Sequence, residues 1–533
     1  MPASDTVMMV ALLALFIGLI GFLSYMGYRR TKNASDYMLA GREIHPFIMA
    51  MSYGAAFIST SAIVGFGGVA ATYGMGILWL AFMNILFGIF IGFRYFGRRT
   101  RAMGRHLDAK TFPEFMGRRF NSTGVTLFIS MVIFLFMPVY TSAVLMGGAR
   151  VMEEVLKIPY FTALLVFAAV ITVYVIVGGL RGMMYVDALL GTVMVAGMVA
   201  LLVLTYGEMN GFISTHKELT SMVGLVPEKF KAIGHQGWTS MPRFNSQWWW
   251  TLVSSLMLGV GIGALAQPQL AVRFMTVKNN HELNRAIWVG AVFIMLTAGG
   301  AYVVGALSNV WFYRNWGKIA CEMVPDGNID RIIPTFITLA LPKWFVYIFT
   351  VTLLSAAMST MSALLHVTGT SIGHDFFGNL GMKKFGSVAL TKAGIIFAIV
   401  ASVLLGHVLP GSYIARATAI FFGICAASFL PAYAAALYWK RVTRAGVWAS
   451  MVSGAAVSIF SLLFMHRAES GMLGLCKLLF GRTELVSIGM WPFVDSLVYS
   501  LPVSVVVLVV VSLLTKPDMA CAESCFASLK KEQ

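Results

Sequence analysis

In the segment Gly259-Val260-Gly261-Ile262-Gly263-Ala264-Leu265-Ala266-Gln267-Pro268, glycines and a Gln-Pro pair interrupt an apolar stretch that could otherwise cross a bilayer. A second apolar stretch, residues 45–73, is interrupted in the same way by Gly54, Gly65, Gly67 and Gly68. Glycine also serves close helix packing in membranes, so either break alone has a simple explanation. Breaks at matching places in two halves of a chain instead indicate an inverted repeat, with a solute site near the bilayer midplane.

The composition is that of a polytopic membrane protein. Hydrophobic residues make up 58% of the 533 residues and charged residues 11%, far from the average of a soluble protein. Apolar runs of about 20 residues recur from near residue 5 to residue 515. The sequence therefore predicts an all-α integral membrane protein with about thirteen spans, in which the two broken spans lie five apart.

Basic residues set the predicted orientation. The first span, about Asp5 to Tyr28, is followed by Arg29 and Arg30, so we expect a retained helix whose N-terminus lies outside. The densest basic loop, Arg94 to Arg119, then falls in the cytoplasm together with the C-terminus. This predicts a multi-pass protein of the plasma (inner) membrane. The topology and anionic lipid account for the net charge of +17, so nucleic-acid binding is not expected.

Two hydroxyls share one helix face. Ala356, Ser359 and Thr360 are spaced i, i+3 and i+4, so on a helix they point the same way. Such a face can offer oxygens to a small hard cation. The alternative is that these hydroxyls only hold neighbouring transmembrane helices together.

The cysteines and tryptophans have simpler predicted roles. Five cysteines are too few for a disulfide framework in this chain. Cys321 and Cys476 fall on the predicted outer side, where the sequence leaves their pairing open. Cys521 and Cys525 lie in the predicted cytoplasmic tail, where thiols stay reduced and their role is open. We expect the triplet from Trp248 to Trp250 to form an interfacial aromatic belt rather than to stack on a ligand.

Short motifs follow one another between residues 34 and 450: Asp36-Tyr37 with Gly41-Arg42, Thr111-Phe112-Pro113-Glu114-Phe115, Gly178 to Arg181 with Asp187, Gln267-Pro268 with Arg273-Phe274, Ala356 to Thr360, Asp375, and Leu437 to Arg441. In this order they resemble the sodium/solute symporter family, nearest its pantothenate, monocarboxylate and proline branches. The resemblance implies secondary active transport rather than catalysis, with sodium as the coupling ion and no cofactor. Protons in place of sodium stay an alternative.

The resemblance also implies a domain organisation. Residues 1–30 form an extra N-terminal helix, and residues 31–440 form a ten-helix core with discontinuous first and sixth core helices. The two inverted repeats of the core are about 45–206 and 247–440. Two C-terminal helices follow in 441–515, and 516–533 form a cytoplasmic tail.

The predicted ion ligands come from the same resemblance. Sodium would be held where the first core helix unwinds against the eighth, by carbonyl oxygens and two hydroxyls. The residues that match are Ala55, Ile58, Ala356, Ser359 and Thr360. Unwound backbone in lipid leaves carbonyls that an ion can satisfy.

Two further residues would act in sodium release or in a second ion site. They are Asp187 and Ser362, although Asp187 could instead be a charge favoured at a helix start. Ala56 stands where members with a second sodium site carry a hydroxyl, which favours one sodium per cycle. Arg273 and Asp375 are expected to make salt-bridge or anchoring contacts at cytoplasmic helix ends.

The predicted solute site is small and mildly polar. Its lining residues come from the two broken helices: Phe57, Ser59, Thr60, Ser61, Gly261, Ala264 and Gln267. No acidic residue lies between His45 and Gly92, which argues against a cationic solute. Phe57 to Ser61 resembles the pantothenate and monocarboxylate branches, whereas the proline branch carries an acid at Phe57.

We therefore expect symport of a small carboxylate-bearing solute, monocarboxylate or pantothenate-like, by alternating access. Hydroxyls and exposed amides of the unwound helices can bind a carboxylate without a buried arginine. The alternative is symport of an amino acid such as proline. A membrane sensor on a symporter scaffold is less expected, because only about 18 residues follow the last predicted span.

Overall fold

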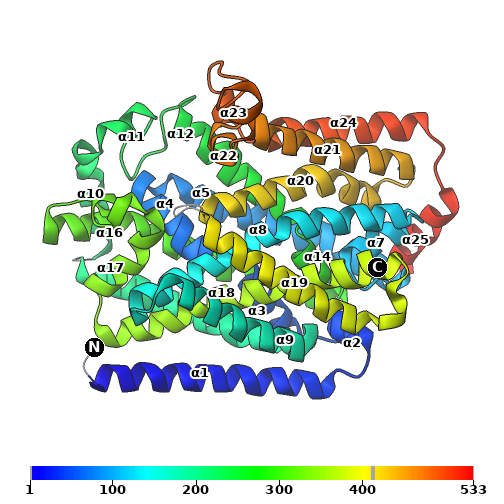
Figure 1. The fold of residues 1–533 in the computed structure, drawn as a ribbon, viewed down its shortest axis with the longest axis horizontal. Coiled ribbons are helices and arrows are strands. Elements are labelled where there is room, and N and C mark those ends of the chain that lie inside the picture. The colour runs from blue at the N-terminus through cyan, green and yellow to red at the C-terminus, as the bar shows by residue number, and fades with distance from the viewer. Residues whose placement is uncertain (1–2, 210, 410–413, 532–533) are drawn as a thin grey trace.

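The computed structural model of the chain describes residues 3–209, 211–409 and 414–531. Within these residues the secondary structure is helical, apart from one isolated β-bridge between Ile44 and Val277. The long helices form one bundle, and the two ends of the chain lie at opposite ends of it (Figure 1). The end that holds the start of the chain is called the outer end below, after the predicted topology. The predicted all-α membrane architecture is confirmed.

Eleven helices of the described residues are long and apolar enough to cross a membrane, or twelve if one bent pair counts as a single span. The longest helical elements are α1 (Ala3–Arg30), α8 (Thr123–Leu156), α9 (Tyr160–Glu208), α15 (Asn280–Ile294), α16 (Gly300–Trp316), α18 (Lys343–Thr370), α19 (Ser387–Val408), α20 (Ile414–Tyr438), α21 (Arg444–Phe464) and α24 (Leu497–Leu514). The span Met75–His106 is assembled from α5 (Leu78–Met83), the π-helix Asn84–Gly97 and α6 (Arg98–His106).

The 49-residue element α9 is divided by a glycine. A straight helix of that length would extend about 74 Å, more than twice the roughly 30 Å hydrocarbon core of a bilayer. Gly179 interrupts it with φ 55° and ψ −170°, a conformation outside the helical region. Splitting α9 at Gly179 would bring the twelve spans to the thirteen that the sequence predicts. An odd number of spans agrees with termini at opposite ends, and the count of thirteen stays a prediction.

Both predicted breaks are present. The helix α3 (Pro46–Phe57) ends at Ile58, whose backbone is extended, and the chain resumes in the π-helix Ser61–Gly65 and α4 (Phe66–Tyr73), with a bend of 51°. The second broken span comprises α12 (Gln247–Trp250), the π-helix Thr251–Val260, α13 (Gly261–Gly263) and α14 (Pro268–Phe274). Gln267 is extended there, since a residue before proline is disfavoured in the α region. The inverted-repeat relation of the two halves stays a prediction.

The accessory helices pack on the core by close contacts. The α1 helix lies along one side of the bundle (Figure 1) and meets α9 so closely that a Cβ on Gly27 would lie 2.2 Å from the Cα of Gly182. At the opposite side, α21 and α24 are joined by hydroxyl pairs, with Ser450 Oγ 2.9 Å from Ser504 Oγ and Thr443 Oγ1 2.7 Å from Thr515 Oγ1. Such polar contacts hold membrane helices together.

Eight shorter helices of the described residues lie between or after these spans. They are α2 (Ala34–Leu39), α7 (Phe112–Arg119), α10 (Phe212–Ser221), α11 (Glu228–Ala232), α17 (Ile332–Ala340), α22 (Arg467–Leu473), α23 (Leu475–Phe480) and α25 (Met519–Lys531). Asp375 accepts a hydrogen bond from Thr111 Oγ1 at 2.9 Å and so connects the end of the span Lys343–Phe377 to the start of α7. All five cysteines are free thiols, so Cys321 and Cys476 are not paired.

Candidate functional site

The break after α3 releases backbone carbonyls in the middle of the protein. The last four carbonyls of a helix have no partner inside it. Ile58 N–H still bonds the carbonyl of Gly54 at 2.9 Å, so the next carbonyl, that of Ala55, is the first to need a partner elsewhere. Ala55 and Ile58 are both buried, away from water. A group on another helix must therefore satisfy this oxygen.

The predicted hydroxyl face of α18 supplies that group. Ser359 Oγ lies 2.8 Å and Thr360 Oγ1 3.2 Å from the carbonyl oxygen of Ala55. Ser359 Oγ is also 3.3 Å from the carbonyl oxygen of Ala356. All of these residues are fully buried. Four of the five predicted sodium ligands thus form one cluster of two carbonyl and two hydroxyl oxygens.

Ile58 is the fifth predicted ligand. It lies at the same break, but no hydrogen bond of the described residues joins its carbonyl to Ser359 or Thr360. The chemistry of the cluster suits a hard cation, because a hydroxyl can turn its hydrogen away and present a lone pair. Among the described residues, no group of three or more His, Cys, Asp and Glu side chains could hold a metal ion.

Asp187, on α9, forms a buried ion pair. It contacts Ser362, which lies one turn after Ser359 on α18. Its Oδ2 accepts hydrogen bonds from Arg273 Nη2 at 2.9 Å and from Ser52 Oγ at 2.8 Å. Its Oδ1 accepts one from Ser362 Oγ at 3.2 Å, and Ser362 Oγ in turn lies 2.8 Å from the carbonyl of Ser359. The side chains of Asp187 and Arg273 are 0% and 1% exposed. Asp187 and Ser362 are therefore in contact, next to the oxygen cluster.

Sequence reasoning did not combine Asp187 with Arg273 and missed Ser52. Arg273 was expected to make a salt-bridge or anchoring contact, and the structure gives it the salt bridge to Asp187. Its Nε also donates to Ser52 Oγ at 3.1 Å. Ser52 precedes Ala55 by three residues on α3, so helical spacing from the predicted ligand could have indicated it.

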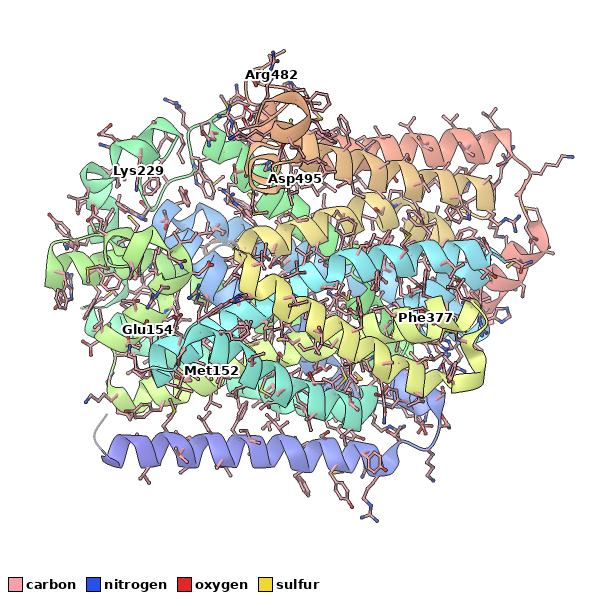
Figure 2. All side chains as sticks on the ribbon, in the orientation of Figure 1. Met152, Glu154, Lys229, Phe377, Arg482 and Asp495 are labelled. Atoms are coloured by element: carbon pink, nitrogen blue, oxygen red, sulfur yellow. The ribbon has the colours of Figure 1, made fainter. Side chains whose placement is uncertain are left out.

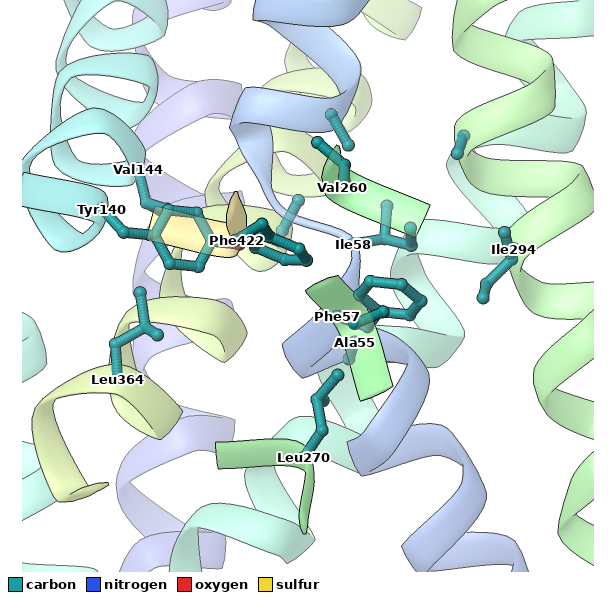
Figure 3. Packing of buried hydrophobic residues seen from close by; sticks show 14 of the residues in the cluster. Ala55, Phe57, Ile58, Tyr140, Val144, Val260, Leu270, Ile294, Leu364 and Phe422 are labelled. Atoms are coloured by element: carbon teal, nitrogen blue, oxygen red, sulfur yellow. The ribbon is translucent and has the colours of Figure 1, made fainter. Parts of the chain in front are cut away.

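An aromatic row crosses the break. The ring of Phe57 stacks on that of Phe422 with centroids 6.4 Å apart, and Tyr140 meets Phe422 edge-on at 5.5 Å. Figure 3 shows Tyr140, Phe422 and Phe57 in this order, with Ile58 and Ala55 beside Phe57. Tyr140 and Phe422, on α8 and α20, were not predicted, because no local pattern marks a ring that faces a distant segment.

The predicted hydroxyl run Ser59-Thr60-Ser61 points in two directions. Ser59 Oγ and Ser61 Oγ are hydrogen-bonded to each other, and the Tyr140 hydroxyl joins them. Thr60 Oγ1 instead donates to the carbonyl of Val144 on α8 at 3.1 Å. The two serines therefore share an environment with the aromatic row, and the Thr60 hydroxyl is engaged by backbone.

The predicted residues of the second broken span approach the same region from the other side. A Cβ on Gly88 would lie 2.7 Å from the Phe57 ring and 3.5 Å from the Ala264 side chain, so these two residues meet at Gly88. Gln267 accepts a hydrogen bond from Gln269 at 2.9 Å. Gly261 packs against Met83, where a Cβ would lie 2.8 Å from that side chain. All predicted lining residues are buried.

The aromatic belt predicted for the tryptophan triplet is wrong for Trp248. This side chain is 7% exposed and stacks on Tyr73 with ring centroids 4.1 Å apart. The physical reason is that the Trp248 backbone N–H donates to the carbonyl of Ile233 at 2.9 Å and its ring lies on Tyr73, so Trp248 faces protein rather than the membrane interface. Hydropathy alone does not tell whether a tryptophan at a span boundary faces protein or the membrane interface.

Several known proteins resemble this chain over most of its length. The Sodium/proline symporter of Staphylococcus aureus (strain JH9) is 27% identical over 536 residues, which cover 98% of this chain and 94% of that protein. The Osmoregulated proline transporter OpuE of Bacillus subtilis (strain 168) is 27% identical over 446 residues, 83% of this chain and 86% of that protein.

A solved structure shares the fold. A substrate-bound, outward-open Na⁺-coupled sialic acid symporter superimposes with a TM-score of 0.74 over 96% of this chain and 98% of its own, at 17% sequence identity. Residues 37–454 match the Sodium:solute symporter family. With this match over most of its length, and with a buried oxygen cluster at the break of its first core helix, the chain belongs to the sodium:solute symporter family, whose transporters use sodium as the coupling ion.

Proposed function

We propose that this chain transports a small amino acid such as proline together with sodium, by alternating access, across the plasma (inner) membrane. One observation carries the coupling part of the proposal. The hydroxyls of Ser359 and Thr360 meet the carbonyl of Ala55 at the end of a broken helix. An ion bound there would connect α3 to α18, so its arrival and departure would change how the two helices are held together.

The residues of this cluster have the following proposed roles. Ala55, Ile58 and Ala356 contribute carbonyl oxygens, and Ser359 and Thr360 contribute hydroxyls. Asp187 and Ser362 act in sodium release, since the Ser362 hydroxyl contacts both the Asp187 carboxylate and the Ser359 carbonyl. One sodium ion moves in each cycle. The N-terminus lies outside and the C-terminus in the cytoplasm.

Coupling to one sodium ion is energetically adequate. Each charge that crosses contributes about 2.3 kcal/mol per 100 mV of membrane potential. At about 1.4 kcal/mol for each factor of ten, this supports a gradient of roughly fortyfold for a net-neutral solute. An amino acid zwitterion is such a solute.

The choice of solute follows the relatives. Proteins named proline transporters or sodium/proline symporters align with 82% to 98% of this chain. They favour the amino-acid alternative over the monocarboxylate or pantothenate-like solute that the sequence first suggested. The surroundings of the break suit proline, because the rings of Phe57 and Phe422 offer an apolar surface and the Ser59 and Ser61 hydroxyls offer hydrogen bonds.

A monocarboxylate or pantothenate remains a second candidate because of Phe57. The proline branch carries an acid at this position, whereas Phe57 here is 5% exposed and stacked on Phe422. A solute without an ammonium group would not need that acid. The hydroxyls and free amides at the break could still bind its carboxylate.

Uptake by proteoliposomes tests both parts of the proposal. Vesicles containing the full chain are given labelled L-proline, acetate or pantothenate, with an inward gradient of sodium or of choline. Accumulation of proline above its outside concentration with sodium alone is expected. Equal uptake in both gradients would contradict sodium coupling, and accumulation of acetate or pantothenate but not of proline would reverse the choice of solute.

A further inference from the structure

The C-terminal helix α25 packs against the core at the inner end of the bundle, the end opposite the outer end. It lies beside α7 (Figure 1), at the end where Figure 2 labels Phe377. Ser524 Oγ of α25 lies 2.8 Å from His106 Nε2 at the end of α6. The Cys521 thiol donates to the carbonyl oxygen of Arg119, the last residue of α7, at 3.3 Å. These contacts attach α25 to both α6 and α7.

Ring contacts attach the same helix to the end of α20. The Arg119 guanidinium carbon and Lys440 Nζ each lie 5.6 Å from the centroid of the Phe526 ring, a distance at which a cation is attracted to an aromatic face. Arg119 Nε also donates to the carbonyl oxygen of Ala436 on α20 at 3.1 Å. Arg119 is therefore the group through which α25, α7 and α20 are joined.

Two thiols of α25 lie beside Arg119. Cys521 and Cys525 are spaced i, i+4, so they share one face of the helix. Their thiols are in contact with each other, and the Arg119 guanidinium lies next to both. Cys521 is partly exposed, whereas Cys525 is only 1% exposed. A small oxidant in solution therefore reaches Cys521 first.

The Arg119 guanidinium also has a donor without an acceptor. Arg119 is 2% exposed, and its Nη2 makes no hydrogen bond within the described residues. A buried, charged donor without a partner is costly. A thiolate or a sulfenate oxygen beside it would supply the acceptor. The surroundings of the two thiols therefore favour the charged forms through which a thiol is oxidised.

With hydrogen peroxide as the oxidant, the oxidation of this pair is balanced. The Cys521 sulfur attacks one peroxide oxygen, the O–O bond breaks, and a sulfenic acid forms while one water leaves. The Cys525 sulfur then attacks the Cys521 sulfur, and the S–O bond breaks as the hydroxyl leaves with the Cys525 proton as a second water. Burial raises the pKa of the Cys525 thiol to about 11, so this thiol stays protonated until Cys521 has reacted.

We propose that Cys521 and Cys525 form a thiol-oxidation site at which a peroxide produces a disulfide, and that this disulfide detaches α25 from α6 and α7. On a helix, Cβ atoms four residues apart are about 5–6 Å from each other, whereas a disulfide needs about 3.5–4.5 Å. The bond must therefore distort α25 and withdraw the Cys521 sulfur from the Arg119 carbonyl. Strained disulfides are readily reduced. In the orientation proposed above, cytoplasmic thiols would restore the docked helix.

Mass spectrometry of the full chain, with one chain in each lipid nanodisc, detects the bond. After treatment with hydrogen peroxide, the tail peptide of a non-reduced digest is expected to have lost two hydrogen atoms, and dithiothreitol should restore them. In Cys525→Ser, the Cys521 sulfenic acid has no partner and should be captured by dimedone, which should leave the wild type unlabelled. Cys321→Ser is the matched control, because Cys321 is also a partly exposed thiol but lies outside α25.

Hydrogen exchange measures the docking of α25. The disulfide is expected to speed exchange of the α25 amides roughly tenfold or more, because these amides would leave a packed surface. Exchange of the α8 amides should stay unchanged, which shows that the core is folded. Peroxide-treated Cys525→Ser should keep the slow exchange of the reduced protein, and Cys321→Ser should respond like the wild type.

The outcomes test separate parts of the proposal. Oxidation of Cys521 to a sulfinic acid without a disulfide would overturn the pairing of the two thiols. A disulfide that leaves exchange of α25 unchanged would overturn the detachment. Equal acceleration in peroxide-treated Cys525→Ser would show that the cross-link is not what releases the helix. None of these measurements uses uptake, so a failure of the proposed transport function would leave this inference standing.

Discussion

The hydroxyl of Ser359 lies 2.8 Å from the carbonyl oxygen of Ala55, 304 residues away in the chain. The two atoms join the middle of α18 to the end of α3, and Thr360 adds a second contact to the same oxygen at 3.2 Å. In the structure these groups satisfy one another. At the proposed sodium site, an ion would have to compete with these two internal hydrogen bonds, which would moderate its affinity and favour its release.

Replacing both hydroxyls tests this site. Ser359→Ala with Thr360→Ala removes two of the proposed ligands, and we expect the half-saturating sodium concentration for uptake to rise at least tenfold. Ser355→Ala is the control, since the Ser355 hydroxyl donates to Val351 one turn earlier on the same helix. Uptake is measured across a series of sodium concentrations. An unchanged sodium requirement would return the pair to a role in helix packing.

We expect the Asp187–Arg273 ion pair to contribute both to the stability of the folded protein and to transport. Removing one partner of a buried ion pair costs about 3–5 kcal/mol, because the other charge is left alone. Asp187→Asn and Arg273→Gln should each lower the thermal stability of the purified protein, and the double variant should recover part of the loss. If the losses of thermal stability in the two single variants simply add up in the double variant, the two side chains do not act as an ion pair. If the double variant folds but releases sodium slowly, Asp187 has the proposed role in release.

The close contact between α13 and α20 predicts that Gly263, in the second broken span, does not tolerate a larger residue. A Cβ on Gly263 would lie 2.6 Å from the carbonyl oxygen of Phe422, so Gly263→Ala must separate α13 from α20, at a cost of about 1–3 kcal/mol. We expect uptake to fall below a tenth of the wild-type rate. Gly207→Ala serves as control because no atom lies within 4 Å of the added carbon. Wild-type uptake by Gly263→Ala would show that this contact is not needed.

The segment between α11 and α12, which holds His235 and is called the outer loop here, is expected to loosen in acid. His235 is 5% exposed and its Nδ1 accepts the Gly237 N–H at 3.0 Å, and burial lowers the pKa of His235 from 6.5 to about 4. Between these values the unfolded loop binds a proton that the folded loop does not, so the stability present above pH 6.5 is lost as the pH falls. At pH 5 the loss is about 2 kcal/mol.

Hydrogen exchange of the loop amides, corrected for the intrinsic effect of pH, measures this change. His235→Asn should remove most of the pH dependence, and His407→Asn, a substitution outside the loop, should leave it intact. Equal protection of the wild-type loop at pH 5 and pH 7.5 would contradict the assignment.

The fold was largely predictable because its strongest signals are local. Apolar runs, the glycines around residue 65 and the Gln267-Pro268 pair indicate spans and breaks from composition alone, and the breaks are present at Ile58 and Gln267. The hydroxyl face of α18 follows from helical spacing. The number of spans was harder to fix, since a single glycine in α9 determines whether one element counts as two.

The rest of the site depends on contacts between distant segments. The pairing of Asp187 with Arg273 and the row of Tyr140, Phe422 and Phe57 follow from how helices are placed, which no local pattern encodes. Hydropathy likewise cannot tell a tryptophan that faces lipid headgroups from one that faces protein, so Trp248 was misplaced. Sodium coupling was favoured from the start, whereas the choice of solute moved toward the amino-acid alternative.

The hydroxyl pairs between α21 and α24 have a mechanical consequence. Because these pairs join the two helices along their length, α21 and α24 must tilt as one body. The backbone N–H of Asp495, just before α24, donates to Ser254 Oγ in the second broken span at 3.0 Å. Any movement of the second broken span would therefore displace both accessory helices within the surrounding lipid. The stiffness of that lipid would then affect the rate of the transport cycle.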